Sequence, residues 1–233
     1  TLLCMQRETC LLALATLVWL TGWIPAQNSN RKIRAQPSAM AARAGSAVVW
    51  REDLSTALAE SAKTGKPVFW YVTTVAGSPM DRKPEIDRYM MSGPFSWPRT
   101  IALLNTGFIP VRGVARGAEA KKYQLLRGKF IEPGYVVLDG KGEELARKDQ
   151  LTTFHQQWFC RPLENLVAVK LPPTQPSPAL SAYMEGVALF HAGESGKAIA
   201  HWQKIAAKYP DDPMAFKSAA EADALAAKAR ANV

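Results

Sequence analysis

The run Gly65-Lys66-Pro67-Val68-Phe69-Trp70-Tyr71-Val72 decides the fold of this 233-residue chain. After the Gly-Lys-Pro turn, every residue is a valine or an aromatic, which is typical of a central strand that is covered on both faces. Apolar residues at helical spacing predict a helix over residues 53–63 just before this run, and Gly65 is a good helix stop. A buried strand fed by a helix indicates an α/β domain.

Further elements follow on the C-terminal side of this run. The turn Asp139-Gly140-Lys141-Gly142 predicts a hairpin between two short strands. Apolar patterns predict strands over residues 108–114, 135–138 and 144–147, and helices over residues 81–91, 97–104, 118–127 and 152–169. The sequence therefore predicts a central mixed sheet with flanking helices.

The order of these elements resembles the thioredoxin-fold family over residues 49–168. The resemblance rests on Lys66-Pro67 before the central strand, on Phe108-Ile109-Pro110-Val111-Arg112, and on the stretch from Ile131 to Asp139. It implies an α/β thioredoxin-like sandwich over residues 46–170, in which Pro133 matches the family's cis-proline. In active members the backbone beside that proline pairs with an extended peptide. Glu132, Pro133 and Gly134 either keep such a protein-binding edge or serve only the geometry of the fold.

The position of the family's Cys-x-x-Cys motif holds no cysteine. The chain has Thr73-Thr74-Val75-Ala76-Gly77-Ser78-Pro79-Met80 there, and a serine cannot exchange disulfides. We therefore expect no catalytic residues of dithiol chemistry. Cys160 is the one cysteine of the predicted folded part, and it is either a reactive thiol or a small buried side chain.

Residues 171–178 are rich in proline and predict a linker, and the Ala-rich residues 179–233 predict a small all-α helical hairpin followed by a third, solvating helix. Gly186, Leu189, Ala198, Trp202 and Pro210 fall at the spacings of one tetratricopeptide repeat, which this part resembles. One face of its first helix is expected to dock a protein partner or to cover the neighbouring domain; its residues are Leu180, Tyr183, Val187 and Phe190.

The N-terminus is hydrophobic and predicts a helix. Residues 1–27 form either a cleaved signal or a retained membrane anchor, because the apolar run over residues 9–26 is just long enough to span a bilayer. Residues 28–45 are polar and basic and predict a flexible tether. The rest is then expected to be periplasmic or otherwise extracytoplasmic. The anchor residues are Leu11, Leu12, Leu14, Leu17, Val18, Trp19, Leu20 and Trp23.

The net charge of +9 has its excess between residues 28 and 176. The basic residues do not gather on a groove-fitting element with stacking aromatics, so we expect no nucleic-acid partner and favour anionic lipid or an acidic protein. The three histidines are dispersed and phosphate-binding loops are missing, so we expect neither a metal nor a cofactor.

Two functions are consistent with these features. The first is a redox-inactive thioredoxin-fold protein that acts as a protein-binding scaffold or as an accessory subunit of a membrane-associated complex. The alternative is a thiol-disulfide pathway factor or chaperone that uses the lone Cys160.

Overall fold

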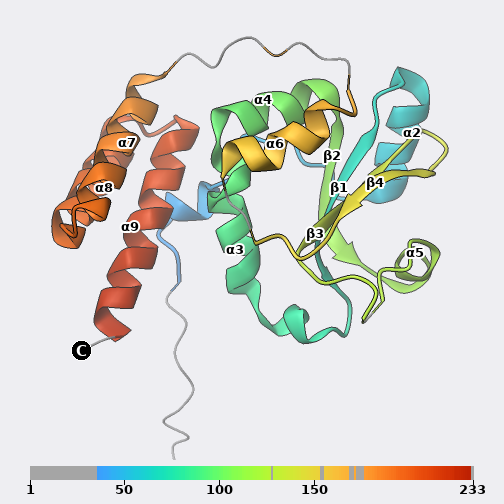
Figure 1. The fold of residues 1–233 in the computed structure, drawn as a ribbon, viewed down its shortest axis with the longest axis horizontal. Helices are drawn as coiled ribbons and strands as arrows, with labels where there is room; N and C mark the ends of the chain where they lie inside the picture. Colours follow the sequence, from blue (N-terminus) through green and yellow to red (C-terminus); the bar gives the residue numbers. More distant parts are fainter. Residues whose placement is uncertain (1–35, 127, 153–154, 168–170, 172–175, 232–233) are drawn as a thin grey trace, which may run out of the picture. The chain divides into compact units, whose positions relative to one another are not determined.

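The computed structural model describes residues 36–126, 128–152, 155–167, 171 and 176–231 of the chain (Figure 1). Its central feature is one mixed sheet of four strands in the order β2-β1-β3-β4. The strands are β1 (Val68–Val75), β2 (Ile109–Ala115), β3 (Gly134–Leu138) and β4 (Glu144–Lys148). The mixed sheet with flanking helices and the helical C-terminal segment confirm the α/β class predicted from the sequence.

The central strand β1 pairs with β2 in parallel and with β3 in antiparallel orientation, and β4 is antiparallel to β3. Side chains alternate along β1: Trp70 and Val72 enter one apolar cluster, and Phe69 and Tyr71 enter the other. All four are buried, so β1 is covered on both faces, as its composition predicts. The register between β3 and β4 shifts between Val137 and Leu138, which places a bulge in the edge strand β4.

Two sets of helices cover the two faces of the sheet. Buried residues of α2 (Leu54–Thr64) and α5 (Gly117–Lys122) belong to the cluster around Trp70. Buried residues of α3 (Pro84–Ser92), α4 (Pro98–Gly107) and α6 (Gln156–Glu164) belong to the cluster around Phe69, together with Phe95 of the 3-10 helix η3 (Pro94–Ser96). The ring of Phe95 lies edge-on to that of Phe159 at 5.4 Å. Each layer of helices therefore buries one side-chain row of β1.

The boundaries of α2 have local causes. The Asp53 carboxylate accepts hydrogen bonds from the amides of Ser55 and Thr56 at 2.9 and 3.0 Å, which satisfies two otherwise unpaired donors of the first turn. Gly65 ends the helix with φ of +73°, a left-handed conformation that glycine adopts without a steric penalty.

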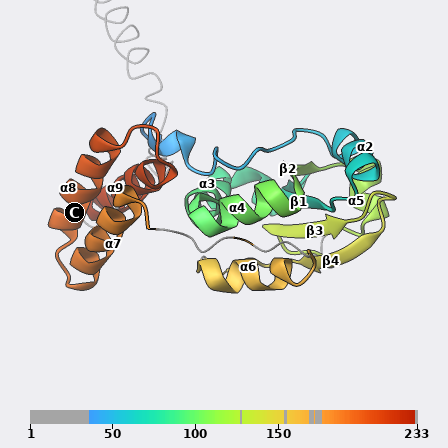
Figure 2. The same ribbon diagram turned by 90° about the horizontal axis from the view of Figure 1, so that it is seen from above.

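The C-terminal segment consists of α7 (Pro178–His191), α8 (Ser195–Lys208) and α9 (Pro213–Ala231), which Figure 2 shows packed together. α7 and α8 approach closely at Gly186, where an added Cβ would lie 2.2 Å from Nε1 of Trp202. The third helix was expected to be solvating, and this expectation is wrong for its first turns. Residues 214–219 of α9 are all buried, because this helix packs against α3, η3, α7 and α8.

The start of the described chain also differs from expectation. Part of the predicted flexible tether forms the 3-10 helix η1 (Ala41–Arg43), which packs on α9. The Arg43 guanidinium lies 4.0 Å from the centroid of the Phe216 ring and donates to the Pro210 carbonyl at 3.0 Å. These non-local contacts order a segment whose own sequence has no apolar periodicity. The N-terminal hydrophobic helix predicted for residues 1–27 lies outside the described residues.

Candidate functional site

The turn after β1 stands where the sequence resemblance would place a pair of cysteines. Ser78 accepts a hydrogen bond from the amide of Met80 at 3.1 Å and so caps the 3-10 helix η2 (Pro79–Arg82). The hydroxyl of Thr74 lies 3.1 Å from the Ser78 hydroxyl. Both hydroxyls thus hold the shape of the turn, and neither resembles an activated nucleophile, which requires an adjacent base.

Glu132 connects this turn to the start of β3. Its side chain is only 9% exposed, and its Oε1 accepts a hydrogen bond from the amide of Val75 at 3.1 Å. The Glu132–Pro133 peptide bond is cis. The carbonyls on either side, those of Ile131 and Pro133, accept hydrogen bonds from the amides of Gln150 and Leu151 at 2.7 and 3.0 Å. The chain itself therefore already pairs much of the backbone around the predicted protein-binding edge.

Gly134, the third residue of that edge, is required by close packing. An added Cβ would lie 2.5 Å from Cζ of Phe130 and 2.7 Å from the carbonyl oxygen of Lys148. A side chain at this position would push β3 away from the segment that follows β4. Gly134 thus contributes to the geometry of the edge rather than to a contact surface.

Cys160 lies on the buried face of α6. It is 1% exposed, and its Sγ lies 3.3 Å from Oγ1 of Thr100. Burial raises the pKa of the Cys160 thiol to about 11, so that the thiol stays protonated at neutral pH. A protonated and inaccessible thiol is a poor nucleophile. The geometry therefore favours a small buried side chain over a reactive cysteine.

The structure separates the four residues predicted on one face of α7. Tyr183 is buried, with its ring 5.7 Å from Trp97, which precedes α4, and 6.0 Å from Trp202 of α8. Leu180 and Val187 are partly buried in the same cluster. Phe190 is 42% exposed. The start of this face covers the α/β part, whereas its end at Phe190 is accessible.

A buried lysine next to Tyr183 was not predicted from the sequence. Lys217 of α9 is 3% exposed; its Nζ donates to the Ser92 carbonyl at 2.6 Å and to Oε1 of Glu221 at 3.0 Å. The same Nζ lies 5.0 Å from the ring centroid of Trp97 and 5.2 Å from that of Tyr183. Burial lowers the pKa of the Lys217 amine, while the Glu221 carboxylate opposes that change. The only sequence signal was Glu221 four residues later, a spacing that usually indicates an exposed ion pair.

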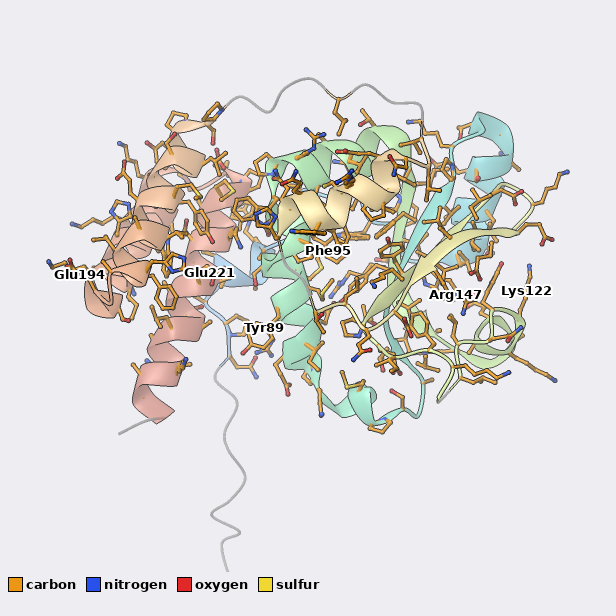
Figure 3. All side chains as sticks on the ribbon, viewed as in Figure 1. Tyr89, Phe95, Lys122, Arg147, Glu194 and Glu221 are labelled. Atoms are coloured by element: carbon orange, nitrogen blue, oxygen red, sulfur yellow. The ribbon has the colours of Figure 1, made fainter. Side chains whose placement is uncertain are left out.

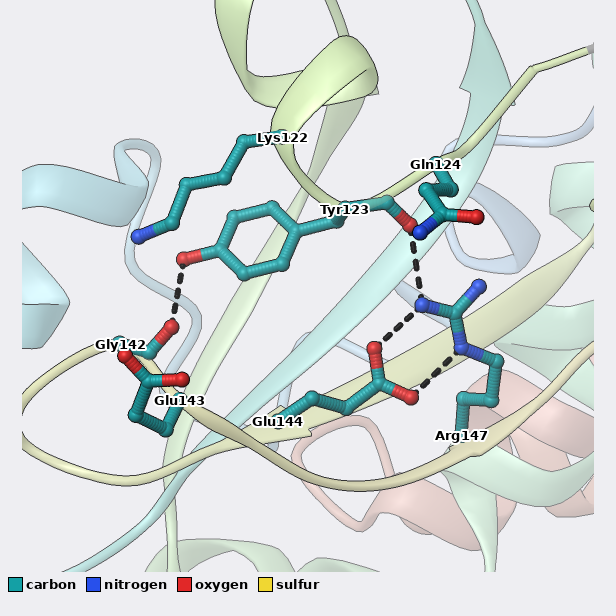
Figure 4. A pocket seen from close by; sticks show the side chains of 7 residues that line it. All are labelled: Lys122, Tyr123, Gln124, Gly142, Glu143, Glu144 and Arg147. Atoms are coloured by element: carbon teal, nitrogen blue, oxygen red, sulfur yellow. Dashed lines mark hydrogen bonds and ion pairs between the residues drawn. The ribbon is translucent and has the colours of Figure 1, made fainter.

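A small cavity of about 160 Å³ lies between α5 and the β3–β4 hairpin, as Figure 4 shows. The Tyr123 hydroxyl donates to the Gly142 carbonyl at 3.1 Å, and the Arg147 guanidinium donates to the Tyr123 carbonyl at 2.9 Å and to both oxygens of Glu144. The Tyr123 hydroxyl raises the pKa of Lys122. Lys122 therefore stays charged, and Tyr123, Glu144 and Arg147 are held by hydrogen bonds within the lining of the cavity. Its lining consists of Lys122, Tyr123, Gln124, Gly142, Glu143, Glu144 and Arg147.

Tyr71 presents a further buried polar group. Its hydroxyl lies close to the ion pair between Asp87 and Arg112. Burial, followed by the charge of Asp87, raises the pKa of Tyr71 well above its usual value. The hydroxyl therefore stays protonated and does not act as a base.

Neither a cluster of metal ligands nor a helix able to span a membrane occurs within the described ranges. Across those residues, no three His, Cys, Asp or Glu side chains lie close enough together to bind a metal ion. No helix in the described part of the chain combines the length and the apolar character needed to cross a bilayer. The predicted anchor residues, from Leu11 to Trp23, lie outside the described residues.

Comparison with known proteins identifies no family for this chain. No protein-family model matches the sequence. No curated protein shows significant similarity to it.

Proposed function

We propose that this chain is a redox-inactive thioredoxin-fold protein that acts as a protein-binding scaffold or as an accessory subunit of a membrane-associated complex. One observation carries the proposal: the turn after β1 holds Ala76-Gly77-Ser78-Pro79 in place of a cysteine pair, and its serine caps a 3-10 helix. The chain therefore resembles the thioredoxin fold but lacks the cysteines that dithiol exchange requires.

Several features support the thioredoxin-like and tetratricopeptide-like character of the two parts. The sheet order, with a parallel β1–β2 pair and an antiparallel β1–β3 pair, is compatible with the resemblance, as is the cis bond before Pro133. The close approach of α7 and α8 at Gly186 and Trp202 is the contact expected between the two helices of a tetratricopeptide hairpin. Repeats of this kind bind other proteins in many contexts, so the chain would combine two binding modules.

The proposed location is the extracytoplasmic side of a membrane. The support is the apolar run over residues 9–26, followed by a basic segment. The proposed partner is a protein, and the accessible Phe190 at the end of α7 is the proposed point of contact. No observation favours the alternative of a thiol-dependent factor, because the Cys160 thiol is buried and its pKa is raised.

The test is isolation of the tagged full-length chain from membranes of its native host in mild detergent. We expect intact-mass analysis to find stoichiometric protein partners. Phe190→Ser should reduce their recovery at least about tenfold, which corresponds to about 1.4 kcal/mol. The matched control is Leu145→Ser, which removes an apolar side chain of similar exposure, 50% against 42%, from β4 and should leave recovery unchanged.

The two possible failures are distinct. A wild-type chain that is isolated alone and monomeric would contradict the scaffold function. Partners that are retained by the Phe190→Ser variant would instead exclude the end of α7 as the contact and leave the function standing.

A further inference from the structure

Lys217 lies where three parts of the molecule meet. Its ammonium contacts the last carbonyl of α3 at Ser92, the Trp97 ring before α4 and the Tyr183 ring of α7. Its counter-charge is Glu221, one turn later on the same helix; Figure 3 labels Glu221 on α9. A single side chain thus connects α9 with both the α/β part and α7.

Stability alone does not explain a charge at this position. Moving an ammonium from water into a protein interior costs several kcal/mol, and replacing a buried ion pair by apolar groups of similar volume is often neutral or stabilising. The surroundings are suited to an apolar side chain, since the rings of Trp97 and Tyr183 flank the Lys217 ammonium. The best-attested role of such a buried charge is to fix the register of a helix.

The sequence of α9 makes register a real problem. The helix is rich in alanine, and small residues recur one turn apart along the side that packs inward, at Ala215, Ala219 and Ala222. Along this row, a shift by one helical turn would place small side chains on small side chains again, so the registers are distinguished by the large buried residues Met214 and Phe216 and by the polar contacts of Lys217. Lys217 breaks this repetition, because its Nζ meets the Ser92 carbonyl at only one position of the helix.

We propose that Lys217 is a positioning residue whose buried ammonium selects the single register in which α9 docks on α3, η3 and α7. Because α7 and α8 pack on α9, this register also sets where the accessible Phe190 lies relative to the α/β part. The inference does not depend on the proposed scaffold function, since it concerns only contacts within the chain.

The register is measured by disulfide trapping in the full-length chain, with Cys4 and Cys10 replaced by serine and Cys160 by alanine. Ser38→Cys is combined with Asp223→Cys, since the Ser38 amide donates to the Asp223 carboxylate at 2.7 Å. Two shifted pairs combine Ser38→Cys with Ala219→Cys or Ala227→Cys, one turn to either side. With Lys217 present, the native pair should close at least about tenfold faster than either shifted pair, a difference of about 1.4 kcal/mol.

The same rates are then measured with Lys217→Met and Glu221→Gln together, so that no buried charge is left unpaired. We expect this variant to melt cooperatively near the wild-type temperature, while the preference for the native pair falls to about threefold or less. The matched control is Lys228→Met, which removes an exposed lysine from the same helix and should leave the tenfold preference intact.

Either of two results would overturn the proposal. One is an unchanged preference for the native pair in the Lys217→Met, Glu221→Gln variant. The other is loss of cooperative melting in that variant, because Lys217 would then supply stability rather than register.

Discussion

At the scale of single residues, Gly186 shows how a missing side chain brings two helices together. The indole of Trp202 occupies the space that a Cβ of residue 186 would need, at 2.2 to 2.8 Å, and its Nε1 donates to the Tyr183 carbonyl at 3.3 Å. An alanine would force either the indole or the whole of α8 to move. The close packing of α7 on α8 therefore requires that residue 186 has no side chain.

We predict that Gly186→Ala lowers the free energy of unfolding by about 1–3 kcal/mol, the usual range for overpacking of a well-filled core. Thermal or urea unfolding of the purified full-length chain would measure this. The matched control is Gly196→Ala in α8, where an added Cβ meets nothing within 4 Å. That change should be neutral or stabilising by up to about 1 kcal/mol, because alanine favours the helix. Equal effects of the two substitutions would show that the Trp202 contact is not tight.

At the scale of elements, the cap of α2 links folding to pH. Hydrogen bonds from the side chains and then the amides of Thr56 and Ser55 lower the pKa of Asp53 from 3.8 to about 2. A carboxyl whose pKa is lower in the folded state stabilises the fold above its unfolded pKa. That contribution is fully present above pH 3.8 and is lost as the pH falls toward 2.

We predict that Asp53→Ala lowers the melting temperature at pH 6. The difference in melting temperature from wild type should shrink between pH 4 and pH 2, because these two pH values bracket the unfolded and folded pKa of Asp53 at 3.8 and about 2. Melting curves by circular dichroism across this range would check it. Asp53→Asn is the control, since asparagine also caps helices but does not titrate. A deficit of Asp53→Ala that is independent of pH would exclude the charged cap.

Elements with a local cause could be predicted from the sequence. The valines and aromatics of β1, the spacing within α2 and the stop at Gly65 are local signals, and the structure has both elements there. The burial of α9 has no such signal. An alanine-rich helix with Lys217 and Glu221 four residues apart is typical of a solvated surface. Its burial comes from packing against α3, η3, α7 and α8, and Lys217 itself contacts Ser92 and Trp97, more than a hundred residues earlier.

At the scale of the whole molecule, these long-range contacts make the C-terminal helices part of one folded body with the α/β part. Arg43 of η1 contacts Phe216 of α9, and Lys217 of α9 contacts Ser92 of α3. The sequence alone indicated a linker and a helical hairpin that either covers the neighbouring domain or docks a partner, because a proline-rich stretch carries no information about which distant surfaces meet. The same limit applied to the candidate site. Phe190 was predicted from its spacing along the helix, whereas the buried contacts of Lys217 could be recognised only from the tertiary structure.

We predict that a chain ending at residue 176 unfolds at a lower temperature and binds hydrophobic dyes, because Trp97 loses the cover of α7 and α9. Melting and dye binding would be compared with a control chain that ends at Ala227 and lacks only the exposed end of α9. The control should match the full-length chain. A chain ending at residue 176 that melts like the full-length chain would show that the C-terminal helices are an independent module.

The bulge in β4 has a consequence for how copies of this chain behave at high concentration. The strand is short, has its bulge at Leu145, and carries the charged residues Glu144, Arg147 and Lys148. Such an edge is a poor template for strand addition, since a second strand would meet an irregular ladder and charged side chains. Concentrated solutions should therefore resist the growth of fibrils by edge-to-edge stacking of sheets.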